Sequence, residues 1–329
     1  MTQIEHMSEA GLLQRILPLL DQGADVEVGP GDDAAVVALD SPRLVLTTDT
    51  LTEGQDFLRE TTRPVWIGRK AAVQNLADVA AMGARPQAVV LSLSAPADTE
   101  VTVLEGIAHG LAERCRADEV SVVGGDVGAA EVLSVTVAAV GALPGGVEPI
   151  LRSGARPGDV LAIGTDRMGR SAAGLAAVLA DRADDPVFAD LVAWHNAPDP
   201  HISLGWTAAR TASPHSCGTG ATSMIDVSDG LVRDARRIAD ASGVLLDLDR
   251  SALEPDARAL EVPGQQLSMD PWEWVLHGGE EHALLATFPV GSVPRGFRPI
   301  GEARPAGPDG GAVLLGGDDI PGAGWDHFA

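Results

Sequence analysis

A glycine- and proline-rich segment, residues 143–159, divides the chain into two parts that each need a hydrophobic core of their own. The 329 residues exceed the size that one core usually serves, and domains of about 150 residues are common. Strand-like and helix-like runs alternate on both sides of the segment. We therefore predict a two-domain protein of the α+β or α/β class, with a mixed αβ N-terminal domain (1–145) and an αβ C-terminal domain (146–329).

Hydrophobic periodicity and turn residues place the elements within each half. In the first half we expect helices at 8–22, 64–82 and 99–115, and strands at 35–39, 43–48, 88–93, 120–123 and 132–141. In the second half we expect strands at 160–163, 244–248, 283–288, 298–300 and 312–315, a strand ending near Ile225, and helices at 171–179, 228–241 and near 272–276. Ser228 and Asp229 are the predicted N-caps of the helix that follows them.

Composition and charge exclude several classes of protein. The formal net charge of −24 argues against nucleic-acid binding, which needs a basic surface. No stretch approaches the ~18 apolar residues of a membrane span, and the N-terminus lacks the basic region of a signal peptide. Cys115 and Cys217 have no metal-ligand spacing, which is typical of reduced thiols in a cytoplasmic protein. The single lysine, Lys70, excludes a Walker A loop.

Acidic residues recur at predicted strand ends and in tight glycine turns of both halves. They are Asp32 and Asp33 after Gly31, Asp49 beside Thr47 and Thr48, Asp78 beside Asn75, Asp126 after Gly124 and Gly125, Asp226 and Asp229 around Ser228, and Glu280 and Glu281 after Gly279. Each group alone has an ordinary explanation as a turn, a cap or a salt bridge. Hard Mg²⁺ prefers carboxylate and hydroxyl oxygens, so the repetition indicates a site that holds magnesium and phosphate groups.

Taken in order, several segments resemble those of thiamine-monophosphate kinases. They are GPGDDAAVV, TTDTLTEG, KAAVQNLADVAAMGARP, VVGGDV, RSGARPGD, MIDVSDGLVRD, VLHGGEEHALLATFP and GWDHF, which together run from about residue 29 to 328. The resemblance implies the fold of the aminoimidazole ribonucleotide synthase-like superfamily. In that fold the N-terminal domain contributes strands to a homodimer interface, and the C-terminal domain completes the ATP and substrate sites.

The resemblance also implies a reaction and its residues. ATP would phosphorylate thiamine monophosphate to thiamine diphosphate by direct in-line transfer with several Mg²⁺ ions. The implied metal ligands are Asp33, Thr47, Thr48, Asp49, Asp78, Asp126, Asp226 and Asp229. Gly125, Asp126, Arg152 and Ser228 would line the ATP site, and Glu280 and Trp325 would contact the thiamine group.

Two positions depart from the family pattern. Asp56 stands where a substrate-contacting histidine is expected, and it would pair with the cationic thiazolium, bind another Mg²⁺ or repel the substrate phosphate. Glu281 replaces an aspartate. Two alternatives therefore stay open, a related ATP-dependent enzyme with an altered substrate and a non-catalytic homologue that binds nucleotide or thiamine phosphates. The retained aspartates count against the second alternative.

The chemistry fits these residue types independently of the resemblance. Donor and acceptor are both phosphates, so repulsion between anions makes up much of the barrier, and metal ions neutralise it. The acceptor is already an ionised oxygen, so a strong general base is unnecessary. Arg152 would supply a fixed cation where lysine is absent.

Overall fold

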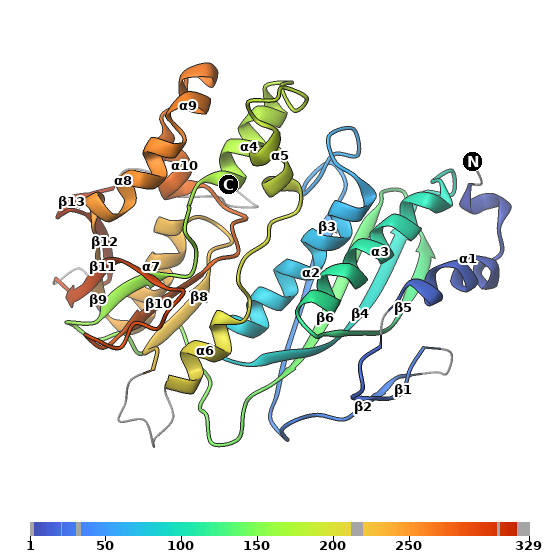
Figure 1. The fold of residues 1–329 in the computed structure, drawn as a ribbon, viewed down its shortest axis with the longest axis horizontal. Coiled ribbons are helices and arrows are strands. Elements are labelled where there is room, and N and C mark those ends of the chain that lie inside the picture. The colour runs from blue at the N-terminus through green and yellow to red at the C-terminus, as the bar shows by residue number, and fades with distance from the viewer. Residues whose placement is uncertain (1–2, 21, 31–33, 212–219, 308–309, 321–329) are drawn as a thin grey trace. The chain divides into compact units, whose positions relative to one another are not determined.

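The computed structural model describes residues 3–20, 22–30, 34–211, 220–307 and 310–320 (Figure 1). The chain forms two compact units. The first comprises Met1–Val79 and Arg85–Pro144, and the second comprises Ala80–Ala84 and Gly145–Ala329. The short segment 80–84 thus belongs to the second unit, although strands of the first unit lie on both sides of it in the sequence.

The first unit is built on a four-stranded sheet with the strand order β3-β6-β4-β5. Its strands are β3 (Leu44–Thr52), β4 (Arg85–Ala95), β5 (Ser121–Ala129) and β6 (Ser134–Ala142). The β3/β6 and β6/β4 pairs are antiparallel, and the β4/β5 pair is parallel. Leu51, Val135 and Leu93 pair across the sheet and are all buried, so they mark the face that forms the core.

Two helices, α2 (Pro64–Ala81) and α3 (Val101–Ala117), cover that face of the sheet (Figure 1). They pack through glycines. A Cβ atom at Gly68 would lie 2.0 Å from the carbonyl oxygen of Ile107, and one at Gly110 would lie 1.9 Å from that of Val65. The two helix backbones therefore approach each other closely, and α2 is held at a fixed position over β3.

The N-terminal segment departs from the predicted long helix. It contains η1 (Ile4–His6), α1 (Glu9–Ile16), η2 (Leu17–Leu19) and the short hairpin of β1 (Val26–Val28) and β2 (Val36–Val37). The predicted helix 8–22 was too long, because Pro18 lacks a backbone N–H and the α-helix gives way there to a 3-10 turn.

Strands β3, β4 and β5 of the first unit are longer than predicted, and β3 and β5 show the reason. We placed the end of β3 at Thr48 and that of β5 at Val123, because polar residues and glycines follow. In the structure these residues remain paired with β6 and β4, and Thr50 and Thr136 share a hydrogen bond of 2.9 Å between their hydroxyl groups. Cross-strand pairing stabilises polar strand residues in a way that single-sequence patterns do not reveal.

The second unit contains a seven-stranded sheet with the order β13-β12-β9-β11-β7-β10-β8. Neighbouring strands are antiparallel except for the β12/β9 pair. The strands are β7 (Val160–Ile163), β8 (Ser223–Asp226), β9 (Val244–Leu248), β10 (Leu284–Phe288), β11 (Arg298–Pro305), β12 (Ala312–Leu315) and β13 (Asp318–Asp319). The predicted bounds of β7, β9 and β12 are confirmed.

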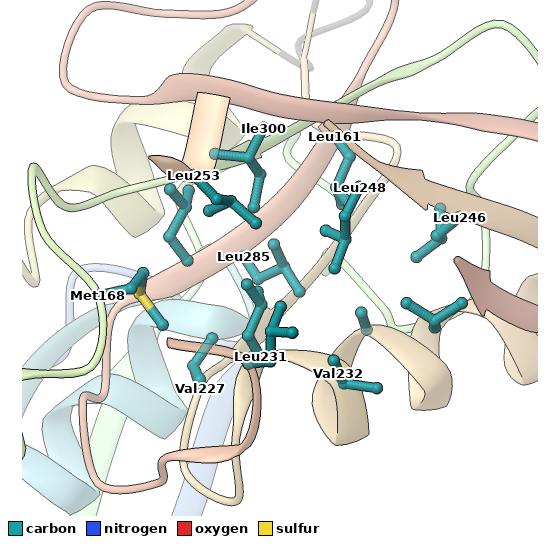
Figure 2. Close-up of a cluster of buried hydrophobic side chains, with 14 of the residues drawn as sticks. Leu161, Met168, Val227, Leu231, Val232, Leu246, Leu248, Leu253, Leu285 and Ile300 are labelled. Atoms are coloured by element: carbon teal, nitrogen blue, oxygen red, sulfur yellow. The ribbon is translucent and has the colours of Figure 1, made fainter. Parts of the chain in front are cut away.

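The described helices of this unit are α4 (Arg170–Leu179), α5 (Ala189–Asn196), α6 (Leu204–Thr211), α7 (Leu231–Ser242), α8 (Arg250–Ala259), α9 (Glu261–Leu267) and α10 (Pro271–His277). Of these, α4, α7, α8 and α10 contribute buried apolar side chains to the same cluster as the sheet. Figure 2 shows Leu231 and Val232 of α7 beside the strand residues Leu285 and Leu248. Among the described residues, no helix is both long and apolar enough to cross a membrane.

Candidate functional site

Three polar side chains and the backbone of Asp49 make contacts between β3 and α2 in the first unit. The Thr47 hydroxyl donates to Asp78 Oδ2 (2.7 Å), and the Asp49 backbone N–H donates to Asn75 Oδ1 (3.1 Å). Thr47 and Asp49 share one face of β3 because side chains alternate along a strand, and Asn75 and Asp78 share one face of α2. We call these residues the β3–α2 polar cluster (Thr47, Asp49, Asn75 and Asp78).

Helix α2 itself fixes the orientation of Asn75 in this cluster. Asn75 is almost fully buried, and its amide donates to the Ala71 carbonyl (3.0 Å), which orients its oxygen toward β3. Asp78 is half-buried, less than its apolar sequence neighbours suggested. The structure thus brings together Thr47, Asp49 and Asp78 of the predicted metal ligands.

The remaining predicted ligands of the first unit lie elsewhere. Thr48 is on the opposite face of β3 and donates its hydroxyl to the Val137 carbonyl (2.9 Å). Asp126 is exposed on β5, at the other edge of the sheet, in a row that runs through Ser92 and Thr136 to Thr50. Three strand spacings amount to roughly 14 Å, so Asp126 is not part of the β3–α2 polar cluster.

Gly125 has a structural reason to be glycine. A Cβ atom there would lie 1.8 Å from the Leu91 carbonyl oxygen of the paired strand. The resemblance implies that Gly125 lines the ATP site, and the close approach that the structure shows at Gly125 is made by the backbone of β4.

Asp56 closes the turn that follows β3. Its carboxylate accepts a hydrogen bond from the Thr52 N–H (2.7 Å), its carbonyl accepts one from Lys70 Nζ (3.0 Å), and Gly54 supplies a positive φ of 84°. At this position, where a substrate-contacting histidine is expected, one carboxylate oxygen therefore stabilises the local backbone.

In the second unit, an acidic loop (residues 278–282) connects α10 to β10. It runs beside the segment after β8, because the Glu280 N–H donates to the Ser228 carbonyl and the His282 N–H to the Val227 carbonyl, both at 2.8 Å. Glu280 and His282 both have left-handed backbone conformations, with φ values of 59° and 51°. Such conformations are uncommon for residues other than glycine and often accompany functional constraint.

The side chains of Glu280, Glu281 and His282 in the acidic loop contact different partners. Glu280 Oε2 lies 3.2 Å from His195 Nδ1. Glu281 accepts hydrogen bonds from the backbone N–H of Ser171 (2.8 Å) and from Trp194 Nε1 (2.9 Å). His282 Nδ1 lies 3.2 Å from Asp226 Oδ2. The loop therefore connects α4 and α5 with the end of β8.

Glu281 is completely buried, and burial raises the pKa of its carboxyl group above the ordinary value of 4.5, while the N–H of Ser171 and the guanidinium of Arg170 oppose this effect. The Arg170 guanidinium lies 3.2 Å from the centroid of the Trp194 ring. A cation and two N–H donors thus surround the carboxyl group, which explains how it is accommodated in the interior.

The raised pKa of Glu281 predicts a pH-dependent stability. The unfolded chain loses this proton near pH 4.5, before the folded chain does, so ionisation of Glu281 lowers the free energy of unfolding as pH rises from 4.5 through the folded-state pKa. Glu281→Gln cannot ionise. Urea unfolding from pH 4 to 8 should show the wild type losing stability relative to this variant with rising pH, and a difference independent of pH would contradict the prediction.

Asp226 and Asp229 lie on either side of Ser228, at the start of α7. Asp226 is buried at the end of β8. Asp229 is ion-paired with Arg237, and its N–H donates to Asp234 Oδ2 (2.9 Å). Burial raises the pKa of Asp234 to about 6. The predicted capping role of Ser228 and Asp229 is wrong, because the N-cap of α7 is Gly230, with a φ of 118° and no side-chain cap.

Arg152 is held at the far end of the same helix. The Ser242 hydroxyl donates to the Arg152 carbonyl (3.1 Å), and Ser242 is the last residue of α7. Twelve helical residues span about 18 Å, so the structure places the Arg152 backbone at the opposite end of α7 from Ser228.

Asp33 and Trp325 lie outside the described residues. Within the part of the chain that is described, no three His, Cys, Asp or Glu side chains form a group that could hold a metal ion. Sequence reasoning missed Ser171, Trp194 and His195, because they lie 85 to 110 residues from their acidic-loop partners in the sequence and belong to no recognised motif.

The comparisons with known proteins first define a class. The family described as "AIR synthase related protein, N-terminal domain" matches residues 31–143. The solved structure "AaThiL complexed with AMPPCP and TMP" has a TM-score of 0.77 at 31% identity, covering 100% of this chain and 99% of that one. A thiamine-monophosphate kinase from Stenotrophomonas maltophilia K279a has a TM-score of 0.80 at 27% identity, with 95% and 98% covered.

A curated relative is more similar in sequence. The thiamine-monophosphate kinase of Mycobacterium tuberculosis (strain ATCC 25618 / H37Rv) is 42% identical over 327 residues, which cover 99% of this chain and 93% of the relative. The chain therefore belongs to the thiamine-monophosphate kinase family. The predicted αβ fold and kinase class are confirmed.

Proposed function

We propose that the chain transfers the γ-phosphoryl group of ATP to thiamine monophosphate, giving thiamine diphosphate and ADP. One observation carries the proposal: along its whole length, the chain matches a relative that was solved with AMPPCP and TMP. The oxygen-rich β3–α2 polar cluster supports it independently, because phosphoryl transfer between two phosphates depends on positioning and charge neutralisation more than on a catalytic base.

Magnesium fits the β3–α2 polar cluster. Its donors are the Thr47 hydroxyl and the carboxylates of Asp49 and Asp78, all of them hard oxygen ligands. Mg²⁺ usually takes one or two protein carboxylates and completes its shell with waters and substrate phosphates. A site with two acids thus suits this ion. Binding of further ions by Asp33, Thr48, Asp126, Asp226 and Asp229 remains part of the proposal.

The residues of the cluster prearrange the donors. The Thr47 hydroxyl orients the Asp78 carboxylate, and Asn75 holds the β3 backbone at Asp49. Bound magnesium would neutralise charge on the phosphates that meet there. In the second unit we propose that Ser228 contacts ATP. We also propose that Glu280 of the acidic loop faces the cationic thiazolium, because the Glu280 side chain is partly exposed.

The proposal has a direct test in substrate selection. The purified chain with ATP and Mg²⁺ is incubated with thiamine monophosphate or with unphosphorylated thiamine, and the thiamine species are separated. We expect thiamine diphosphate from thiamine monophosphate alone. Nucleotide binding without any thiamine product would favour the non-catalytic homologue. ATP consumption with another acceptor would favour an enzyme of altered substrate.

The first unit has an apolar sheet face that supports a homodimer. Leu44, Leu46 and Val90 lie on the face not covered by α2 and α3, and their exposed fractions are 49%, 67% and 41%. Monomeric proteins rarely expose such a continuous apolar surface. We propose that this face packs against the same face of a second copy, and that the protein acts in the cytoplasm.

Substitution of Leu46 by glutamate should disrupt the dimer, because it places a charge within the apolar face. Size-exclusion chromatography with light scattering should give twice the chain mass of 33.9 kDa for the wild type and the single mass for Leu46→Glu. Leu179→Glu is the matched control, since Leu179 is 74% exposed on α4 of the second unit. Equal masses for the wild type and Leu46→Glu would contradict the proposed interface.

A further inference from the structure

We propose that His195 is a positioning residue for Glu280, and that its Nδ1–H group sets the direction in which the Glu280 carboxylate meets a cationic ring. The inference rests on the proposed function for the identity of that ring, but the contact itself is part of the second unit alone. No family pattern in the sequence pointed to His195, which comes from α5, 85 residues before Glu280.

The contacts of His195 favour the tautomer that carries a proton on Nδ1. His195 Nδ1 lies 3.2 Å from Glu280 Oε2 and 3.1 Å from the Ser171 hydroxyl. A carboxylate oxygen only accepts hydrogen bonds when ionised, so Nδ1 must be protonated for this contact to be favourable. The imidazole is 5% exposed. The hydrogen bond is therefore shielded from water on the histidine side, while Glu280 is partly open.

The backbone of Glu280 is already held by its neighbour. Glu281 is anchored between the Ser171 N–H and Trp194 Nε1, and the Glu280 N–H is bonded to the Ser228 carbonyl. Because these hydrogen bonds hold the backbone, the side-chain torsion angles are what can still vary at Glu280. The contact with His195 restricts these torsion angles.

Helix α5 is itself held rigidly, so it can serve as a reference for the loop. A Cβ atom at Gly174 of α4 would lie 2.2 Å from the Leu191 carbonyl oxygen and 2.8 Å from His195 Cβ. The α4 and α5 backbones are therefore in close contact beside the histidine. Trp194 and His195 are adjacent in α5 and contact two adjacent acids, Glu281 and Glu280.

The chemistry of the contact suits a cationic ligand. A carboxylate that accepts a hydrogen bond keeps its negative charge, so Glu280 stays attractive to a positively charged ring. If the contact is lost, Glu280 gains rotational freedom that substrate binding must then remove. The loss should therefore weaken binding of thiamine monophosphate and leave ATP binding unchanged.

Two variants separate positioning from packing. His195→Phe keeps a planar ring without a donor, and His195→Asn places an amide N–H near the position of Nδ1. We expect His195→Phe to raise the KM for thiamine monophosphate about tenfold, the effect of one hydrogen bond to a charged group, with the KM for ATP changed less than about twofold. His195→Asn should restore most of the loss. His201→Phe, at an exposed histidine, is the control.

Coupling to Glu280 provides the decisive comparison. If His195 acts through Glu280, then His195→Phe should add nothing in a Glu280→Ala background, which has no side-chain oxygen to accept from the Nδ1–H group. Additive effects, equal rises in both KM values or failure of His195→Asn to rescue would overturn the inference.

A spectroscopic readout keeps the inference separate from the proposed function. In ¹⁵N NMR spectra of the wild-type chain, the His195 ring should show a protonated Nδ1 whose shift changes in Glu280→Gln. An Nδ1 without a proton, or a shift unaffected by Glu280→Gln, would overturn the inference even if thiamine diphosphate is formed. If none is formed, the proposed function fails and this measurement still decides whether His195 holds Glu280.

Discussion

Replacement of Asp49 by alanine is expected to lower the turnover of thiamine diphosphate formation by about 10²- to 10³-fold, since a lost metal ligand removes several kcal/mol of charge stabilisation. Asp49 faces α2 within the β3–α2 polar cluster, and its backbone N–H, which alanine retains, makes the contact with Asn75. The fold should therefore persist. Steady-state kinetics over a range of Mg²⁺ concentrations, together with thermal unfolding, measure both effects.

Asp98→Ala is the matched control for Asp49→Ala. Asp98 is an exposed aspartate of the same unit, in the turn between β4 and α3, and its removal changes the net charge equally. Turnover of the control should stay within about twofold of wild type, as expected for a surface change. Asp49→Ala turnover above a tenth of the wild-type value, at limiting and at saturating Mg²⁺, would show that the metal assignment to this cluster is wrong.

Replacement of Asp256 by alanine should cost about 3–5 kcal/mol of unfolding free energy, the loss typical of breaking a buried ion pair. Asp256 is 2% exposed. Both of its carboxylate oxygens accept from Arg298 Nη2 at 2.8 Å, and Oδ1 also accepts from the Met168 N–H at 2.7 Å. Burial raises the pKa of this carboxyl, and Arg298 opposes the rise. Alanine leaves Arg298 Nη2 and the Met168 N–H without this acceptor, while the guanidinium keeps its hydrogen bonds to the Thr165 and Ala252 carbonyls.

A pair on the surface provides the comparison for Asp256→Ala. Glu254 and Arg258 lie in the same helix, 3.7 Å apart, with side chains 46% and 70% exposed. Glu254→Ala should cost less than about 1 kcal/mol. Urea unfolding of the two variants measures both losses, and equal losses would show that Asp256 is not part of a buried network.

Local patterns predicted the regular elements with strong periodicity. The helix at 64–82 is confirmed as α2, because Pro64 begins it and Gly83, with a φ of 76°, follows its end. The strands at 160–163 and 244–248 are confirmed because short apolar runs, broken at 244–248 only by Asp247, mark strands buried on both faces. Helices α8 and α9 escaped prediction, and α8 contains Pro255, which a local rule treats as a helix breaker.

The candidate site was only partly predictable, since its residues meet through tertiary packing. The shared face of Asn75 and Asp78 follows from helical spacing alone, whereas the contact of Asp78 with Thr47 depends on how α2 lies over β3. The order of acidic segments predicted the family. It did not reveal that Asp126 lies at the other sheet edge, or that Trp194 and His195 hold the acidic loop.

Phosphorus NMR of the chain with ATP, Mg²⁺ and thiamine monophosphate tests the central proposal most directly, because it follows the donor and the product together. We predict that thiamine diphosphate and ADP appear in equal amounts, and that both stop appearing when EDTA removes the metal. ADP formation without thiamine diphosphate, or undiminished transfer in EDTA, would contradict the proposal of a magnesium-assisted thiamine-monophosphate kinase.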